Sequence, residues 1–262
     1  MDAFERSIGT ELATAGQMEQ MDTKQDNLLQ KLASDPLLRD FTFEVIDLVG
    51  FNAVVARSIP HEQAVAMWRA ACRYRTESRW PILTDDELVH SYYEEIIRQP
   101  QLSLELVRAA RKRVVRSSQS LNAVFERINT AIPSSEAYDE RDAFLEEPSG
   151  PISLVLVDAP MAEAVEPFTG DGEGTMPTHN QLAAMLRHFN QQYGAEPIYA
   201  DGYFLELDVP RPPQHLEDLR AAARDMFLTS QGTHEGYGVE DPARLLRRLM
   251  STRWVLWWYG IY

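Results

Sequence analysis

Apolar residues in the first half of the chain recur at the spacing of a helix face. In one segment, Ala64, Trp68 and Cys72 fall on the same side of a helix, so we expect Cys72 to be a core residue. Between about 101 and 130, apolar residues recur every seven positions: Val107, Val114, Leu121 and Ile128. This spacing predicts a long helix with a packing seam. We therefore expect residues 1–132 to form an all-helical N-terminal domain.

Two helix-start signals support this interpretation. Asp35 precedes Pro36, an order that puts a carboxylate at the N-cap and a proline at the first helical position. Thr84 and Glu87 have the spacing of a capping box, in which each side chain accepts a backbone N–H of the first turn. We expect a helix to begin at each of these two places.

The composition changes between Pro133 and Pro151. This stretch is rich in Ser, Asp and Glu and holds too little apolar material to bury, so we interpret residues 133–151 as a polar linker between two domains. The run that follows, Ile152–Val157, has the length and composition of a buried strand.

Local signals in the C-terminal half alternate between helix and strand. Thr178 and Gln181 form a capping box before an amphipathic segment that ends at Gly194. Asp201 and Gly202 form a two-residue hairpin signal. The expected order is strand, helix, strand, strand, helix, helix, strand. The fold class predicted for the chain is α+β, with an all-helical N-terminal domain followed by a small mixed-sheet domain over residues 152–262.

The strands of this second domain carry two further expectations. After the hairpin, Glu206 and Asp208 alternate with apolar residues and should point to water. The last segment, from Trp254 to Tyr259, is apolar on both faces, which predicts a strand inside the sheet rather than at its rim.

Charge and cysteine content restrict the partners and the compartment. The 262 residues include 40 acidic and 25 basic side chains, a formal net charge of −15. Such a surface repels phosphate, so nucleic acids and anionic membranes are poor partners. No apolar run reaches the roughly 18 residues that span a bilayer, and the acidic N-terminus is unlike a signal peptide. One cysteine cannot form an intramolecular disulfide, and we expect a cytoplasmic protein.

Candidate catalytic and metal-binding motifs are weak. No two of the six histidines have the i, i+4 spacing of a zinc-binding helix face, and the glycine-rich segment 170–174 contains two acids that would repel a phosphate. The predicted long helix has a basic cluster that suits a bound anion or a solvated face: Arg108, Arg111, Lys112, Arg113 and Arg116. We expect no metal, no cofactor and no enzymatic activity, and we assign no catalytic residue.

Acidic residues concentrate in the middle of the chain. Between residues 142 and 186 there is no lysine or arginine, while eight side chains are acidic: Asp142, Glu146, Glu147, Asp158, Glu163, Glu166, Asp171 and Glu173. This segment is either a hydrated linker and loop or a contact surface for a basic protein, because clustered acids speed association with a cationic partner. On the second interpretation, the partner-binding candidates are Asp158, Glu163, Glu166, Asp171 and Glu173.

The second half of the chain, about 150 to 260, resembles an uncharacterised bacterial domain family. The resemblance rests on the segments 186–195 and 209–213 and, most specifically, on the closing W-x-x-W-W formed by Trp254, Trp257 and Trp258. It implies no catalytic residues. Compact acidic cytoplasmic proteins that combine such a domain with a helical one also resemble the immunity proteins of bacterial secreted-toxin systems, type VI or polymorphic.

These observations favour an immunity protein that neutralises a secreted toxin by stoichiometric binding. The partner would be a cognate toxin with a basic surface, a nuclease being one candidate. Two alternatives stay open: an enzyme of unknown reaction with a site in the cleft between two domains, and a scaffold that dimerises through the helix seam. The sequence leaves the oligomeric state undetermined.

Overall fold

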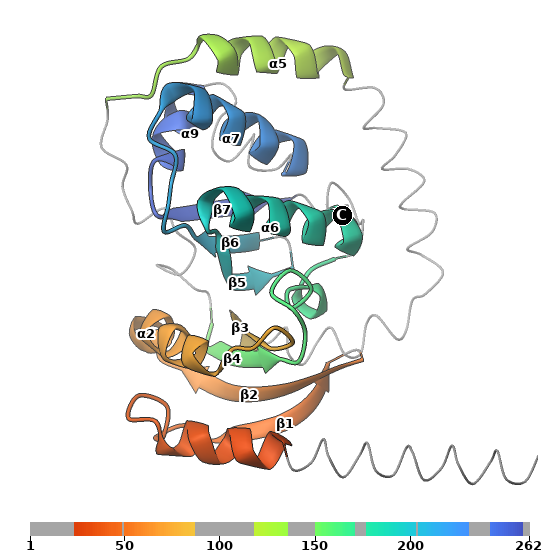
Figure 1. Ribbon diagram of the computed structural model, residues 1–262, viewed down its shortest axis with the longest axis vertical. Coiled ribbons are helices and arrows are strands. Elements are labelled where there is room, and N and C mark those ends of the chain that lie inside the picture. The colour runs from red at the N-terminus through yellow and green to blue at the C-terminus, as the bar shows by residue number, and fades with distance from the viewer. Residues whose placement is uncertain are drawn as a thin grey trace, which may run out of the picture.

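One mixed β-sheet runs through the part of the chain that the computed structural model describes (Figure 1). The described residues are 24–48, 50–86, 118–135, 150–170, 177–202, 204–230 and 242–258. The sheet has seven strands in the spatial order β1-β2-β4-β3-β5-β6-β7. Their bounds are Phe43–Leu48 for β1, Phe51–Ile59 for β2, Trp80–Asp85 for β3, Ile152–Val157 for β4, Glu196–Asp201 for β5, Phe204–Asp208 for β6 and Arg253–Trp257 for β7. All neighbouring strands are antiparallel except β3 and β5, which are parallel.

The all-helical N-terminal domain is wrong, because β1, β2 and β3 come from residues 43–85. In β2 and β3, consecutive side chains are buried on both faces of the sheet, from Ala53 to Ala56 and from Trp80 to Leu83. Such continuous apolar runs lack the period of two that marks a half-exposed strand. The predicted boundaries at 132 and 152 stay a prediction, but the sheet takes strands from both sides of the proposed linker.

The helix start predicted at Asp35 is wrong, and so is the N-cap role of Thr84, although Asp86 is helical and Glu87 lies outside the described residues. Residues 24–34 are helical, and Asp35 follows the end of that helix instead of preceding one. Thr84 lies within β3, where its side chain is buried. The helix predicted around Trp68 is confirmed as α2, His61–Ala71, with Cys72 beginning a short 3-10 helix behind it.

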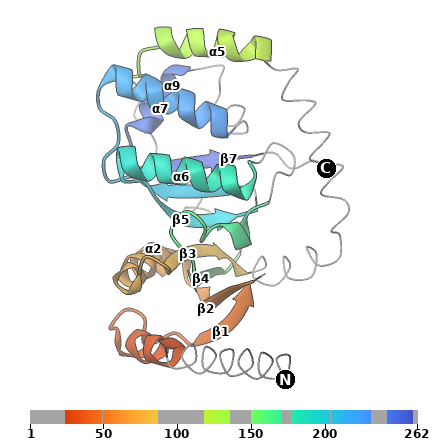
Figure 2. The same cartoon turned by 45° about the vertical axis from the view of Figure 1, so that its right-hand side comes forward.

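Helices cover both faces of the sheet and create two separate cores. On one face, helix 24–34 and α2 pack against Val54, Leu83 and Leu154. On the other face, α6 (His179–Tyr193), α7 (Leu216–Thr229) and α9 (Pro242–Leu249) contribute to a second core that also contains Ile82 and Val155. The described part of α5, Ser118–Thr130, lies outside α7 and α9 as a further layer (Figure 2). Among the residues of the predicted helix seam, Ile128 is buried in this intrachain core.

Strand β3 occupies the centre of the sheet and joins its two halves. On one side it pairs along its whole length with β4, and on the other its Leu83 pairs with Tyr199 of β5. Its alternating side chains reach both cores, Ile82 on one face and Leu83 on the other. The indole N–H of Trp80 also donates to the Pro197 carbonyl at 3.4 Å. Residues 80–85 therefore hold β4 and β5 in one sheet.

Most local signals of the C-terminal half are confirmed. Thr178 and Gln181 form the capping box of α6, and Gly194 ends that helix with φ of 67°. The β5–β6 pair is antiparallel as predicted. Two details are wrong: Glu206 is buried in the sheet, and β7 lies at its rim. Of the helices in the described ranges, none is both long and apolar enough to cross a membrane.

The position of β3 predicts that residues 150–262 expressed alone will not fold. Without β3, strands β4 and β5 have no shared neighbour, and the apolar side chains that both strands pack on it lose their contacts. Urea denaturation of this fragment, followed by far-ultraviolet circular dichroism, should show no cooperative transition. Adding a fragment of residues 24–86 should restore one, and a cooperative transition of 150–262 by itself would contradict the expectation.

Candidate functional site

The predicted acidic surface begins on a loop that crosses one face of the sheet. This loop, residues 158–170, starts at the end of β4, where the Asp158 N–H donates to the Asn52 carbonyl at 2.8 Å. It ends beside β5, where the Gly202 N–H donates to the Phe168 carbonyl at 2.8 Å. Between these anchors its apolar side chains are buried in the core, including Ala164, Val165 and Phe168. The segment is thus part of the packed structure rather than a hydrated linker.

The acids on this loop have partners within the chain. Arg79 Nε donates to Asp158 Oδ1 at 2.5 Å, and Arg187 of α6 forms an ion pair with Glu163. The second carboxylate oxygen of Glu163, Oε2, is buried and has no hydrogen-bond partner among the described residues. These arginines compensate part of the negative charge that a partner protein would otherwise meet.

Glu166 lies beside an imidazole. His179 is the first residue of α6, and its Nδ1 is 3.9 Å from Glu166 Oε2. Its Nε2 is 3.2 Å from the Thr169 carbonyl oxygen, which can only accept, so Nε2 carries the proton of that hydrogen bond. Asp171 and Glu173 lie outside the described residues. The structure brings Asp158, Glu163 and Glu166 onto one loop, and partner binding through the five predicted acids stays a prediction.

A second group of acids lies where the two parallel strands end. Asp85 is the last residue of β3 and Asp201 is the last residue of β5. Between them is Tyr199, whose hydroxyl donates to Asp201 Oδ2 at 3.2 Å. Together with Asp86, which follows β3, we call these residues the carboxyl-end cluster. The carboxyl ends of parallel strands are a preferred place for ligand sites in α/β sheets.

Burial changes the titration of this cluster. Desolvation raises the pKa of Asp201 to about 6, against the lowering effect of the Tyr199 hydrogen bond, and the charge of Asp85 raises it further. The pKa of Tyr199 is raised by burial and then by the charges of Asp201 and Asp85. Asp201 therefore exchanges its proton near neutral pH, which is the property required of a general acid or base.

Asp86 is fixed by hydrogen bonds from two serine residues. Ser153 Oγ donates to Asp86 Oδ1, while the Ser58 N–H and Oγ donate to Oδ2 at 3.1 Å and 3.2 Å. Ser58 has a φ of 56°, a left-handed conformation that is rare for a side chain other than glycine, at a break in the β2–β4 register. The backbone of β2 is thereby turned so that both donors reach one carboxylate.

Glu206 and Arg253 form a buried ion pair in the neighbouring strands. Glu206 is 1% exposed, and Arg253 Nη1 donates to its Oε1 at 2.5 Å. Arg253 Nε lies 3.7 Å from Asp208 as well. The guanidinium explains how a carboxylate predicted to face water is accommodated inside the sheet.

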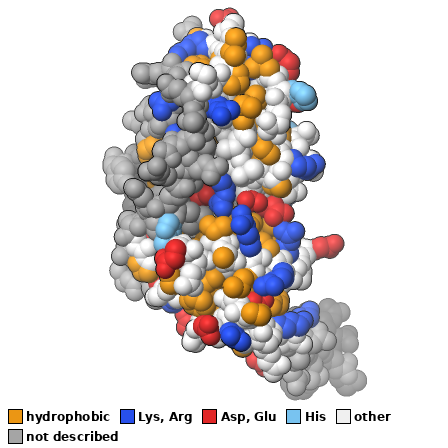
Figure 3. All heavy atoms as spheres, turned by 90° about the vertical axis from the view of Figure 1, so that its left-hand side faces the viewer, with side chains coloured by type: hydrophobic (Ala, Val, Ile, Leu, Met, Phe, Trp, Pro, Cys, Tyr) orange, Lys and Arg blue, Asp and Glu red, His pale blue; other side chains and the backbone are white. Residues whose placement is uncertain are grey.

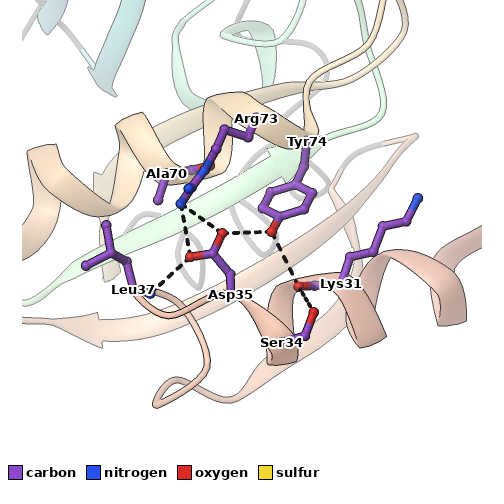
Figure 4. A network of polar contacts seen from close by, with 7 residues as sticks. All are labelled: Lys31, Ser34, Asp35, Leu37, Ala70, Arg73 and Tyr74. Atoms are coloured by element: carbon purple, nitrogen blue, oxygen red, sulfur yellow. Dashed lines mark hydrogen bonds and ion pairs between the residues drawn. The ribbon is translucent and has the colours of Figure 1, made fainter.

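Figure 4 shows a further network that joins the turn after helix 24–34 to the 3-10 helix Cys72–Tyr74 behind α2. The Asp35 side chain is 3% exposed and accepts from Arg73 Nη2 at 2.8 Å, from the Tyr74 hydroxyl at 2.7 Å and from the Leu37 N–H at 3.0 Å. Burial acts to raise the pKa of Asp35, but the Leu37 and Tyr74 hydrogen bonds and the Arg73 charge together lower it. The bonds from Arg73 and Tyr74 hold the two segments together.

Cysteine and metal chemistry receive no support from the described part of the chain. Burial raises the pKa of Cys72 to about 12, so its thiol stays protonated at neutral pH and the core assignment is preferred to a nucleophilic one. Within the described ranges, no three or more His, Cys, Asp or Glu side chains are grouped to hold a metal ion. The basic cluster at 108–116 lies outside these ranges.

The C-terminal half matches one family profile. Residues 155–259 match a domain of unknown function, DUF4253. This match confirms the resemblance to an uncharacterised domain family, while the link to immunity proteins is not part of it. No curated protein and no solved structure matches the chain significantly.

The carboxyl-end cluster is divided by the edge of the DUF4253 domain. Tyr199 and Asp201 lie inside residues 155–259, whereas Asp85, the last residue of β3, and Asp86, which follows it, lie outside. The DUF4253 domain contributes β4 and β5 to the sheet but not the strand that separates them. Any function of this cluster therefore depends on both halves of the chain.

Sequence analysis missed this cluster, although a faint signal was present. Two apolar runs, at 80–85 and 196–201, each end in aspartate. Asp201 was interpreted as a turn residue and Asp85 as part of a helix start. Only the pairing of β3 with β5 puts the two carboxylates near each other, and that pairing joins residues more than a hundred positions apart.

The raised pKa of Asp201 predicts how stability depends on pH. The folded state binds the proton more tightly than the unfolded state, so the free energy of unfolding falls as pH rises from about 4 to 6 and stays lower above that. The variant Asp201→Asn should lose this slope and gain about 1–3 kcal/mol at pH 7.5. Urea denaturation at pH 5.0 and 7.5 measures both effects, with the exposed Asp40→Asn as the matched control. A variant less stable than the parent at pH 7.5 contradicts the expectation.

The buried pair predicts a non-additive loss of stability. Arg253→Met leaves the Glu206 carboxylate buried without its guanidinium, which should cost about 3–5 kcal/mol. The double variant Arg253→Met, Glu206→Gln removes the uncompensated charge and should recover more than half of that loss. Chemical denaturation of both variants gives the two free energies of unfolding. Equal losses in the single and double variants would show that the charge is not the cause.

Proposed function

We propose that the protein is an immunity protein that binds a basic toxin stoichiometrically and thereby neutralises it. The observation that carries this proposal is the charge imbalance, 40 acidic against 25 basic side chains. Even if every basic group were paired with one acid, 15 carboxylates would remain unpaired. An excess of this size attracts a cationic protein and repels other acidic proteins, which favours fast and selective association.

The intrachain ion pairs support the same argument. Many described arginines already lie next to a carboxylate of the chain: Arg57, Arg73, Arg75, Arg79, Arg187, Arg220 and Arg253. Because these guanidinium groups are occupied, they do little to offset the remaining acids at longer range. A basic partner therefore meets a surface potential governed by the excess carboxylates.

The surface over α2 is a poor place for such a partner. Figure 3 shows this side of the molecule, where Lys and Arg side chains lie among hydrophobic ones over the lower half. Exposed residues of this region include Arg69, Arg73 and Arg75. Arg73 and Arg75 are paired with Asp35 and Glu196, so this surface has little excess negative charge to attract a basic toxin.

The proposal includes the compartment and the class of toxin. An immunity protein of a type VI or polymorphic toxin system acts in the cytoplasm, where it meets toxin delivered by neighbouring cells. A nuclease fits the charge argument, because its active site binds an anionic phosphate backbone that clustered carboxylates can replace. Inhibition follows from covering that site or from blocking an assembly that the toxin needs.

Co-expression tests the proposal. The toxin-like gene nearest to the coding sequence should be lethal in a heterologous bacterial host and harmless when this protein is co-expressed. The purified pair should form a complex of fixed stoichiometry, with an association rate that falls at least tenfold between 0.05 and 0.5 M salt. Joint charge reversal of Glu163, Glu166, Asp171 and Glu173 should flatten that dependence, and exposed Asp26→Lys serves as the control. Neutralisation at far below equimolar amounts contradicts a binding mechanism.

One observation favours an enzyme as the second candidate. Asp201, with a pKa of about 6, stands near Asp85 at the carboxyl ends of parallel strands, which is a recurrent arrangement of paired acid and base groups. If this protein inactivates its target catalytically, Asp85→Asn or Asp201→Asn should abolish protection while leaving the protein folded. Stoichiometric binding predicts unchanged protection by both variants.

A further inference from the structure

The two edge strands of the sheet, β7 and β1, differ in how their backbone groups are hydrogen-bonded. At β7, the Trp257 N–H donates to Ser230 Oγ at 2.9 Å, and Ser230 Oγ donates to the Trp257 carbonyl at 2.7 Å. The residue after α7 thus satisfies backbone groups of this rim strand. At the other end, β1 pairs with β2 through an unbroken register from Phe43↔Ala56 to Leu48↔Phe51. Within the described ranges, no strand pairs with the outer edge of β1.

β1 has few of the features that usually protect an edge strand, its two charged residues being Glu44 and Asp47. Its sequence, FEVIDL, contains no proline and no lysine, and its pairing with β2 has no bulge. Val45 of this strand is 44% exposed, and Leu37, in the turn before it, is 54% exposed. An open row of backbone donors and acceptors with an exposed aliphatic side chain is a template for another strand.

The charges near β1 argue against a second copy of this chain as the occupant. Exposed acids at this edge are Asp40, Glu44 and Asp47, against Arg39 and Arg57. Opposite residues of an antiparallel pair share a face of the sheet, so two β1 strands centred on Val45 would put Asp47 opposite Phe43, and two centred on Ile46 would put Asp47 opposite Val45. Neither register gives the acid a basic partner. Two copies would also each carry a net charge of −15. A basic segment would put a positive charge opposite the acids of β1 and would be attracted by the net negative charge of the chain. A second copy of the chain would do neither.

We propose that the outer edge of β1 binds an extended segment of the basic toxin, which adds an eighth strand to the sheet. The inference rests on the proposed function and names its contact surface. Main-chain hydrogen bonds supply affinity, and side chains supply specificity: an apolar residue of the toxin packs beside Val45, and Lys or Arg lies beside Asp47. Because β1 ends the sheet, the bound segment meets no steric obstacle from a neighbouring described strand.

The test is a matched pair of substitutions at exposed aliphatic residues. Val45→Lys puts a positive charge at the edge, while Ile132→Lys makes the same change at a residue that is 72% exposed and follows α5, at the opposite end of the molecule (Figures 1 and 2). With the toxin identified by co-expression, Val45→Lys should weaken binding at least tenfold and Ile132→Lys by less than twofold. Toxin binding should also slow hydrogen exchange of the β1 amides in the unmodified protein. Unfolding transitions of both variants identify any loss of folding.

Each outcome separates this inference from the proposed function. If the toxin is neutralised but Val45→Lys loses less than tenfold in affinity, or the β1 amides stay unprotected, the edge is not the contact surface while the immunity function stands. If no toxin is bound, the immunity function fails, and a synthetic octapeptide of alternating Val and Lys tests the edge alone. That peptide should protect the β1 amides, and a proline-containing peptide of the same charge should not. A dimer of the unmodified protein in light scattering that Val45→Lys dissolves would assign the edge to a second copy and overturn the inference.

Discussion

The insertion of β3 between β4 and β5 is the constraint on which the rest of the structure depends. β3 pairs antiparallel with one neighbour and parallel with the other, so it fixes the relative direction of both half-sheets. Ile82 and Leu83 belong to different cores, which means that this strand also links the packing of the two faces. The DUF4253 domain at 155–259 therefore has its central strand supplied from outside the matched residues. A reading of that domain in isolation omits the element that completes its sheet.

Sequence reasoning succeeded where structure is decided locally and failed where it is decided by long-range pairing. The capping box at Thr178 and the left-handed Gly194 satisfy backbone groups within a few residues, so both were predictable. Strands β2 and β3 were missed because burial on both faces removes the alternation that identifies a strand. The error at Glu206 has a related origin, since alternation shows which residues share a face but not whether that face is covered.

The same distinction between local signals and long-range pairing applies to the candidate sites. The acidity of segment 142–186 was visible in the sequence, but the arginines that compensate Asp158 and Glu163 were not. Arg79 directly precedes β3 and Arg187 lies in α6, so only the fold brings them to these acids. The carboxyl-end cluster needed the β3–β5 pairing, which periodicity cannot show. The net charge of the chain predicts the sign of the charge on a partner's surface. The place of contact depends on which acids are already paired with basic side chains of the chain itself.

The buried and partly buried acids differ in how the cost of their burial is offset. The buried Asp35 and Glu206 and the partly exposed Asp158 each have an arginine nitrogen at 2.5–2.8 Å, which offsets the cost of removing a charge from water. Asp201 accepts its hydrogen bond from the neutral Tyr199 hydroxyl, and Asp85 adds a like charge. A partly buried acid next to a like charge is a local conflict between sequence and fold. Such conflicts concentrate at functional positions, because elsewhere a sequence and its fold agree.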